Sequence, residues 1–303
     1  MTPGNPLNTQ HAVHGYLNSV RIGGKSRATL GFVFVETDRK CHLNDDSGWK
    51  SPLEEFAFVY NAGMGKDPRY QDVAGSVLGI VPWAPIPSGR AVMGRYLDAI
   101  RGIAEEGGGK IKLLKGFRYI LQFCEPGTGL KKEFIEGLKL MGEEGYIFEL
   151  MVDTRSMGVW QLGKHWRRYG KPTMGPLAKP DLHIPPHQVP TNQTFLSWKA
   201  YLASIAILPN TYIKLSGCFS ELPPSLLSPT TSTPREEIVG NAIKYITHWT
   251  NTVFEPFGAK RVIWGSDWPV CTVNGPKEYA WGLWVDVTEG ILRGLNEGEK
   301  EDV

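Results

Sequence analysis

The feature that most constrains the fold is a short, continuously apolar segment that recurs six times along the chain. The first of these begins at Leu30 and has no alternation of apolar and polar residues, which is typical of a strand covered on both faces of a parallel sheet. Charged or polar residues follow each segment. The predicted strands are residues 30–36, 77–83, 111–120, 146–152, 211–216 and 261–267.

Segments with helical periodicity lie between these strands, at residues 91–104, 132–142, 195–208 and 236–254. In the first, Tyr96, Ile100 and Ile103 fall on one helical face. Alternating strands and helices predict parallel βα units. Because no G-x-G-x-x-G follows the first strand, a (β/α)₈ TIM-like barrel is favoured over a dinucleotide-binding fold. We expect one domain over residues 1–303, with a low-complexity surface loop at 222–235.

Charge and apolar content exclude several classes of function. Lys and Arg number 33 against 31 Asp and Glu, so no large basic field favours nucleic acid. No apolar stretch approaches the roughly 18 residues of a membrane span, and no signal peptide precedes the first strand. The four cysteines are widely separated and predict buried, reduced thiols. We expect a soluble, cytoplasmic protein with a small-molecule substrate, and the sequence leaves its oligomeric state open.

Polar residues at the strand ends are the candidate site, because barrel enzymes place their active sites at the carboxyl ends of the strands. Carboxylates there can take a proton from water or bind a cation, and Arg or Lys can hold carbonyl and anionic oxygens. Structural alternatives stay open: a turn cap, an ion pair at the barrel mouth, a solvated loop, or a side chain facing the helices. The candidates are Glu36, Asp38, Arg39, Arg118, Glu149, Asp153, Lys214, Ser216, Ser266, Asp267 and Trp268.

Histidines do not form a recognisable metal motif. None of the seven occurs in H-x-H; His11 and His14 follow no predicted strand, and His183 and His187 lie in a Pro-rich segment. Catalytic zinc needs about three protein ligands, usually including imidazole or thiolate. We therefore predict no tight transition-metal site. The strand-end carboxylates suit only a weakly bound hard cation, and Arg118 and Lys214 are alternative counter-charges.

Several segments resemble one enzyme family. Residues 265–270, Gly-Ser-Asp-Trp-Pro-Val, resemble the last-strand signature of the amidohydrolase-2 branch of the amidohydrolase superfamily, and residues 209–217 resemble its preceding strand. Residues 31–39, 79–84 and 116–119 are similar to sugar-lactone hydrolases of the L-rhamnono-1,4-lactonase type.

The resemblance implies a distorted barrel that opens small lactones by water attack, usually near a divalent metal or its vacated place. It implies that Asp267 is the base for water or a metal ligand, and that Arg118 holds the substrate. We predict that the other strand-end residues bind substrate, namely Glu36, Arg39, Glu149, Lys214 and Trp268. Sister groups decarboxylate aromatic acids, so a decarboxylase, isomerase or cyclase acting on an aromatic or polyketide-like acid is the alternative.

The chain also departs from the family pattern. The opening Asp-x-His-x-His strand has no counterpart, and Pro176 stands where a sixth-strand histidine is expected before Lys179-Pro180. Residues 160–174 look too short for a helix plus a strand, and a closing helix is missing after residue 303. The first and sixth strands are therefore predicted to be degenerate, the barrel incomplete and the metal-ligand set incomplete. An incomplete gene model and a diverged member without metal chemistry both explain this, and a non-catalytic remnant is a further alternative.

Overall fold

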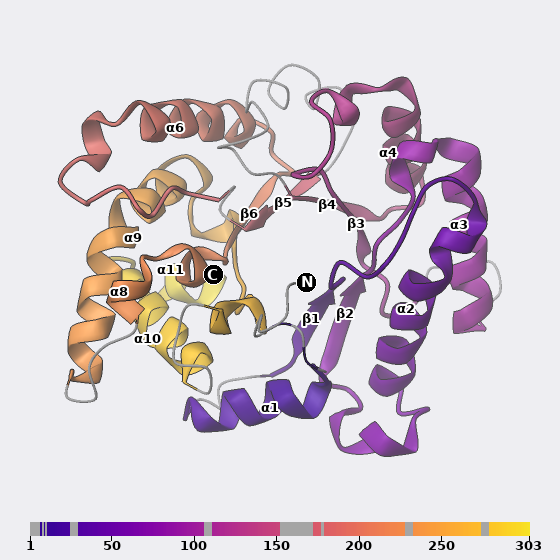
Figure 1. Cartoon of the computed structure of the whole chain (residues 1–303), viewed down its shortest axis with the longest axis horizontal. Coiled ribbons are helices and arrows are strands. Elements are labelled where there is room, and N and C mark those ends of the chain that lie inside the picture. Colours follow the sequence, from indigo (N-terminus) through magenta and orange to yellow (C-terminus); the bar gives the residue numbers. More distant parts are fainter. Residues whose placement is uncertain are drawn as a thin grey trace. The chain divides into compact units, whose positions relative to one another are not determined.

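The computed structural model describes residues 7, 9, 11–24, 30–105, 111–151, 172–176, 179–227, 233–273 and 279–303. These residues gather in two compact units. The first holds residues 30–151 and 172–174, and the second holds residues 11–24 and the described part of 175–303. Each unit combines parallel strands with helices that pack beside them (Figure 1).

In the first unit every strand pairing is parallel, as the alternation of strands and helices predicts. Bridges from Ile80 to Leu114 and from Trp83 to Arg118 connect the chain near β2 to the chain near β3. The strands are β1 (Phe32–Val35), paired with β2 (Val77–Val81), and β3 (Gly116–Ile120), paired with β4 (Ile147–Met151), which also pairs with residues 172–174 of β5 (Pro172–Pro176).

Three long helices pack beside these strands: α2 (Lys50–Gly63), α3 (Arg90–Ala104) and α4 (Lys132–Glu143) (Figure 1). Their apolar faces fill the core with Phe56, Tyr96 and Phe134, which are all fully buried. The bounds of α3 and α4 agree with the prediction to within one residue, whereas α2 was not predicted. Short 3₁₀ turns complete the unit: η1 (Asp46–Trp49), η2 (Pro68–Val73), η3 (Ile86–Ser88) and η4 (Thr128–Leu130).

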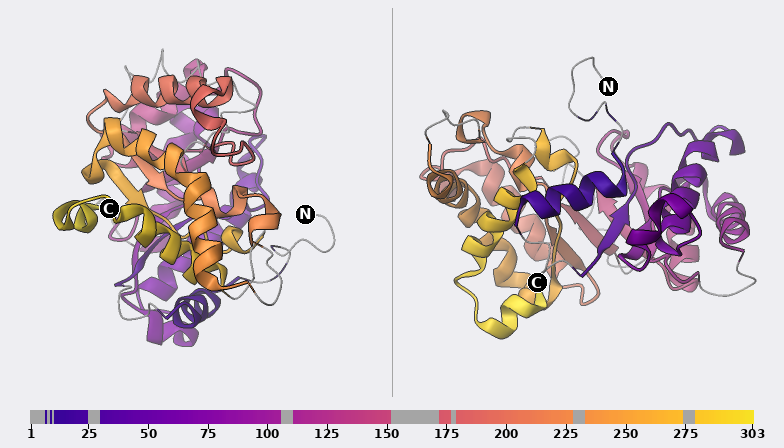
Figure 2. Two further views of the ribbon diagram at one scale, coloured as in Figure 1. Left: turned by 90° about the vertical axis from the view of Figure 1, so that its left-hand side faces the viewer. Right: turned by 90° about the horizontal axis from the view of Figure 1, so that it is seen from below.

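The second unit contains the parallel pair β6 (Tyr212–Leu215) and β7 (Val262–Trp264). Helix α9 (Arg235–Phe257) packs against α6 (Gln193–Ala206) and α10 (Ala280–Leu292), and α1 (Val13–Ile22) packs against α10 (Figure 2). The buried rings of Trp198 and Trp249 meet at 4.9 Å between centroids, which explains part of the high tryptophan content. The short elements are α7 (Cys218–Glu221), α8 (Pro224–Leu227), α11 (Glu297–Asp302), η6 (Val189–Thr191), η7 (Ala259–Arg261) and η8 (Val270–Thr272).

Two local predictions differ from the structure. A strand, β5, exists where a degenerate one was expected, because its prolines stand at the two ends of the strand, where a missing N–H disturbs the ladder least. Within the expected surface loop, Pro224–Leu227 forms a helical turn that buries Leu227, and residues 228–232 lie outside the described residues, as do 160–171.

The prediction that the first two strands are covered on both faces is wrong. Leu30, Val33 and Leu78 are 90%, 52% and 48% exposed, whereas Val77 and Ile80 are buried. Helix α2 packs against β2 on the buried side, and a Cβ on Gly63 of that helix would meet Val77 at 2.8 Å. These strands are therefore covered mainly on one face.

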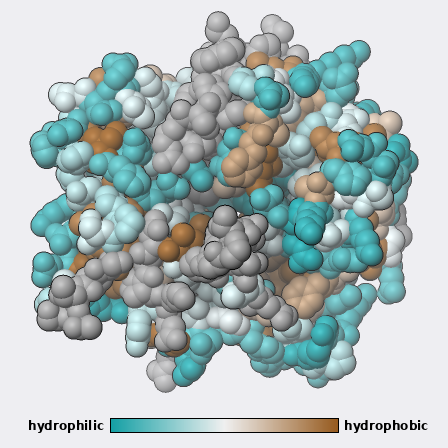
Figure 3. All heavy atoms as spheres, in the orientation of Figure 1, coloured by the Kyte–Doolittle hydropathy of each residue, from teal (hydrophilic) through white to brown (hydrophobic). Residues whose placement is uncertain are grey.

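Hydrophilic residues cover much of the described surface on the face drawn in Figure 3, with hydrophobic residues scattered between them. Within the described part of the chain, no helix is both long and apolar enough to cross a membrane.

Two glycines of α4 provide a test of the packing in the first unit. A Cβ on Gly137 would lie 2.7 Å from the carbonyl oxygen of Ile86, whereas a Cβ on Gly142 would meet nothing within 4 Å. We expect Gly137→Ala to lower the free energy of unfolding by about 1–3 kcal/mol through overpacking. Gly142→Ala, on the same helix, should raise it by about 0.5 kcal/mol through lower backbone entropy in the unfolded chain. Urea titrations of both variants measure the two changes. A change of the same sign in the free energy of unfolding of both variants would contradict this packing.

Candidate functional site

Arg118 and Glu149 lie directly opposite each other on neighbouring parallel strands. Their Cα atoms are register partners in β3 and β4, so both side chains leave the same face of the sheet. Arg118 Nη1 lies 3.5 Å from Glu149 Oε1, and the two side chains are only 11% and 4% exposed. The sequence left the direction of Glu149 open, and the register places it beside Arg118.

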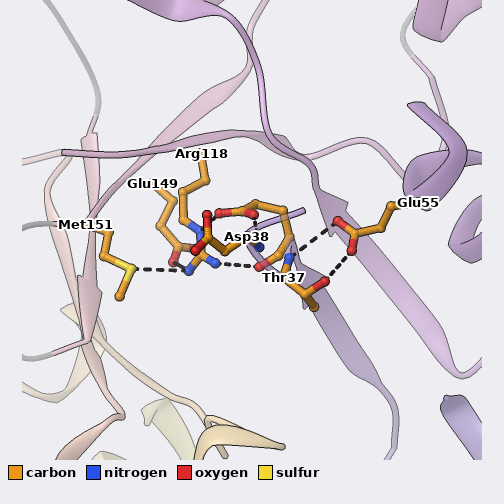
Figure 4. Close-up of polar contacts among 7 residues, drawn as sticks. Thr37, Asp38, Glu55, Arg118, Glu149 and Met151 are labelled. Carbon is orange, nitrogen blue, oxygen red and sulfur yellow. Dashed lines mark hydrogen bonds and ion pairs between the residues drawn. The ribbon is translucent and has the colours of Figure 1, made fainter. Parts of the chain in front are cut away.

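Glu36 joins this pair from the end of β1. Its backbone N–H continues the sheet by donating to the carbonyl oxygen of Val81 at 3.0 Å. Its carboxylate accepts a hydrogen bond from Arg118 Nε at 2.7 Å, and its carbonyl oxygen accepts from Arg118 Nη2. Figure 4 shows the guanidinium beside Glu149 and Met151, whose sulfur lies 3.6 Å from Nη1. We call Glu36, Arg118 and Glu149 the strand-end triad.

The backbone turns sharply after Glu36. Asp38 adopts φ +54°, a left-handed conformation that costs an ordinary residue roughly 1–2 kcal/mol. The Asp38 N–H donates to the Glu36 carboxylate at 2.5 Å, which partly offsets that cost. On the other side of the turn, Thr37 donates its hydroxyl and its backbone N–H to Glu55 of α2 (Figure 4).

The triad has two carboxylates and one guanidinium, all removed from solvent. In a low-dielectric setting the Coulomb attraction is strong, but each carboxylate is costly to bury without a partner. Arg118 therefore holds both carboxylates in fixed positions. Carboxylate oxygens arranged this way can accept further hydrogen bonds from the hydroxyl groups of a ligand.

Asp267 follows β7 in the second unit. It too adopts a left-handed conformation, φ +54°, and its carbonyl oxygen accepts a 2.9 Å hydrogen bond from the Cys271 N–H. Burial raises the pKa of the Cys218 and Cys271 thiols, and the negative charge of Asp267 raises both further. These thiols are therefore protonated at neutral pH, and we assign them no nucleophilic role.

Trp268 is held by aromatic residues near the amino terminus. The rings of His11 and Tyr16 meet its indole edge-on, with centroids 5.4 and 5.7 Å away. The Trp268 N–H donates to the Ser266 hydroxyl at 3.3 Å. Tyr16 of α1 and His11, which precedes that helix, thus support the turn that carries Asp267, a role that the sequence did not indicate for His11.

The predicted site residues divide between the two units. Glu36, Arg39, Arg118 and Glu149 belong to the first, and Lys214, Asp267 and Trp268 belong to the second. The structure brings three of them together as the strand-end triad. Arg39 is exposed, and its positive charge acts to lower the pKa of Glu55. Lys214 lies on β6, opposite Ile263 of β7. Asp153 lies outside the described residues.

Sequence reasoning missed Glu55 and Thr37. Glu55 occupies the buried face of α2 together with Phe56 and Val59, and is itself only 7% exposed. A charged residue on the apolar face of a helix is a readable signal, because such positions are almost always apolar. Glu55 is not among the predicted site residues because no helix is predicted over residues 50–63.

The described residues do not form a metal centre of three His, Cys, Asp or Glu side chains. In the triad, the guanidinium of Arg118 lies between Glu36 and Glu149 where a cation would have to bind. The residues that the structure describes therefore do not fit a protein-bound zinc ion, which needs about three ligands.

Removing the guanidinium should destabilise the first unit strongly. We expect Arg118→Met to lower the free energy of unfolding by about 3–5 kcal/mol, because two buried carboxylates lose their counter-charge. Arg90→Met is the control, since Arg90 forms an exposed pair with Glu143 that contributes little. Urea denaturation of both variants measures the effect, and a similar small loss in each would show that the triad is not a buried ion-pair cluster.

The pKa of Cys41 depends on the negative charges near the strand-end triad. Cys41 is an exposed residue, so the prediction that all four thiols are buried is wrong for it, but partial burial of its sulfur, followed by the carboxylates of Asp38 and Glu36, raises its pKa to about 11. The thiolate fraction, and with it the rate of alkylation by iodoacetamide, should therefore rise up to about pH 11. Asp38→Asn removes one negative charge, lowers the pKa and should speed alkylation at pH 8–9. Peptide mass spectrometry follows Cys41 separately, and an alkylation midpoint near pH 8.5, the ordinary thiol value, would contradict this charge distribution.

Comparisons with known proteins show which proteins the chain resembles. The L-rhamnono-gamma-lactonase of Scheffersomyces stipitis is 30% identical over 312 residues, covering 98% of this chain and 87% of that protein. An amidohydrolase from Burkholderia multivorans has a similar fold, with a TM-score of 0.70 and 17% identity over 98% of this chain and 86% of its own. A second crystal structure of the Burkholderia amidohydrolase contains bound zinc.

The family model for amidohydrolases matches residues 182–303, which include the β6 and β7 strands and the Asp267 turn. The full-length similarity to the Scheffersomyces stipitis protein extends the relationship through the first unit. The chain belongs to the amidohydrolase family.

Proposed function

We propose that the protein hydrolyses the ester bond of a small, uncharged sugar lactone. The observation that carries this is the strand-end triad, in which two buried carboxylates are held by one guanidinium. Such carboxylates accept hydrogen bonds from ring hydroxyls, and their excess negative charge disfavours an anionic ligand. The similarity to a rhamnono-lactonase over the full chain supports the same substrate class.

We infer that the strands and helices belong to a (β/α)₈ barrel, complete or incomplete. The parallel pairings and the similarity to the Burkholderia amidohydrolase support this inference. In that fold the ends of β1, β3 and β4 carry ligand-binding groups. Glu36 directly follows β1, and Arg118 and Glu149 stand two residues before the last residues of β3 and β4, which is why we assign the triad to substrate binding.

Asp267 is the proposed general base. It takes a proton from water, whose oxygen attacks the lactone carbonyl carbon; the ring C–O bond then breaks, the ring oxygen takes up a proton, and a hydroxy acid is released. Arg118 is proposed to hold the carbonyl oxygen in addition to its two carboxylates. Arg39, Lys214 and Trp268 stay proposed substrate contacts. No step is assigned to a metal, because the described residues offer no three-ligand cluster.

Substrate charge discriminates between the proposed function and its alternative. A decarboxylase for an aromatic acid would have to bind a carboxylate, which the excess negative charge of the triad opposes. We therefore expect acid release from aldono-1,4-lactones and no loss of carbon dioxide from aromatic acids. Mass spectrometry of the products distinguishes addition of water from loss of carbon dioxide.

Asp267→Asn tests the assignment of the base. Asn adopts the left-handed conformation as readily as Asp, so the turn after β7 should be preserved. We expect kcat for an aldono-1,4-lactone to fall by about 10²–10⁴, the usual contribution of a general base, with little change in the melting temperature. Acid release followed with a pH indicator measures kcat. Full activity of a folded Asp267→Asn variant would remove Asp267 from the mechanism.

A further inference from the structure

Glu55 is a buried acid that the proposed mechanism does not use. It projects from the middle of α2 toward the turn after β1 (Figure 4). The Thr37 hydroxyl donates to one carboxylate oxygen, and the Thr37 backbone N–H donates to the other at 3.4 Å. Both donors belong to the residue between Glu36 and Asp38.

A carboxylate buried in this position costs folding free energy, because it loses its hydration. Burial raises the pKa of Glu55, the hydrogen bond from the Thr37 hydroxyl lowers it, and the negative charge of Glu36 raises it again. A Leu or Met would fill the same space between α2 and the turn without that desolvation. Glu55 therefore contributes little to the stability of α2, and its role lies in binding Thr37.

Through Thr37, Glu55 holds the segment of backbone that orients the Glu36 side chain. The turn bends through the left-handed Asp38, and its geometry is fixed from two sides. Arg118 binds the carboxylate and the carbonyl oxygen of Glu36 on one side, and Glu55 binds Thr37 on the other. Without Glu55, the turn would keep its connection to Arg118 but lose its connection to α2.

We propose that Glu55 is a positioning residue: acting through Thr37, it sets the position of the Glu36 carboxylate so that Glu36 accepts a hydrogen bond from one hydroxyl of the substrate. The proposal rests on the proposed lactonase function, because it assigns Glu36 a substrate hydroxyl. Glu55 itself touches no reacting atom.

The test measures coupling between Glu55 and individual substrate hydroxyls. An aldono-1,4-lactone and a set of analogues that each lack one hydroxyl are assayed with the wild-type protein and with Glu55→Met. In the wild type, one deoxy analogue should lose about tenfold or more in kcat/KM, as expected for a hydrogen bond to a charged acceptor. In Glu55→Met, the same analogue should lose less than about twofold relative to the parent lactone.

Conservative variants separate positioning from general damage to the fold. Glu55→Gln keeps an oxygen for the Thr37 N–H and offers an amide N–H to the Thr37 hydroxyl, so it should restore the penalty for the missing hydroxyl. Thr37→Val should behave like Glu55→Met, and Thr37→Ser like the wild type. Glu54→Met is the matched control, because Glu54 is the exposed neighbour of Glu55 on the same helix. If Glu55→Met does not fold, the two Thr37 variants carry the test.

The outcomes are distinguishable. If the wild type hydrolyses lactones but every deoxy analogue shows the same penalty in Glu55→Met, Thr37→Val and the wild type, the positioning role is overturned and the lactonase function stands. If all variants lose activity equally on every lactone, Glu55 is only structural. If the folded wild type hydrolyses no lactone in the set, the proposed function fails, and the role of Glu55 fails with it.

Discussion

The ion pairs of Arg118 with Glu36 and Glu149 are the interaction on which the first unit depends. Three charged side chains are buried, one directly after β1 and two within β3 and β4, and neither carboxylate could remain there without the guanidinium between them. The same attraction ties the end of β1 to β3 and β4, strands that are distant in the sequence. Under the proposed function, the structural ion pairs and the substrate-binding group are the same set of atoms.

Backbone geometry makes this interaction possible. The parallel register sets Arg118 opposite Glu149. The Arg118 N–H donates to the Pro82 carbonyl, which links β3 to the chain just after β2, and the Glu36 N–H donates to the Val81 carbonyl, which links the end of β1 to the end of β2. The turn at Asp38 then directs the Glu36 side chain toward the guanidinium. Each step is set by main-chain hydrogen bonds, so the charged groups are placed before any ligand arrives, which lowers the cost of binding one.

Much of this arrangement could be predicted from the sequence, because continuous apolar runs identify buried strands and barrel enzymes use the strand ends. Arg118 and Glu36 were found by that argument. The contact with Glu149 could not be predicted, since a strand's register decides which face a side chain occupies and no local pattern states the register. Glu55 was missed because α2 was missed. A degenerate strand was expected at β5 because residues 160–174 look too short for a helix plus a strand and Pro176 stands where the family has a histidine. Whether Asp267 serves as the base is a chemical assignment that a pattern of residues only suggests.

The central claim is that the strand-end triad binds the hydroxyl groups of a neutral lactone. A crystal structure with an aldonolactam, in which a ring N–H replaces the ester oxygen and prevents rapid hydrolysis, tests it most directly. The account predicts a ring hydroxyl within hydrogen-bonding distance, about 2.5–3.0 Å, of a Glu36 or Glu149 carboxylate oxygen, with Arg118 still between them. A lactam bound elsewhere, with both carboxylates contacting Arg118 alone, would contradict it.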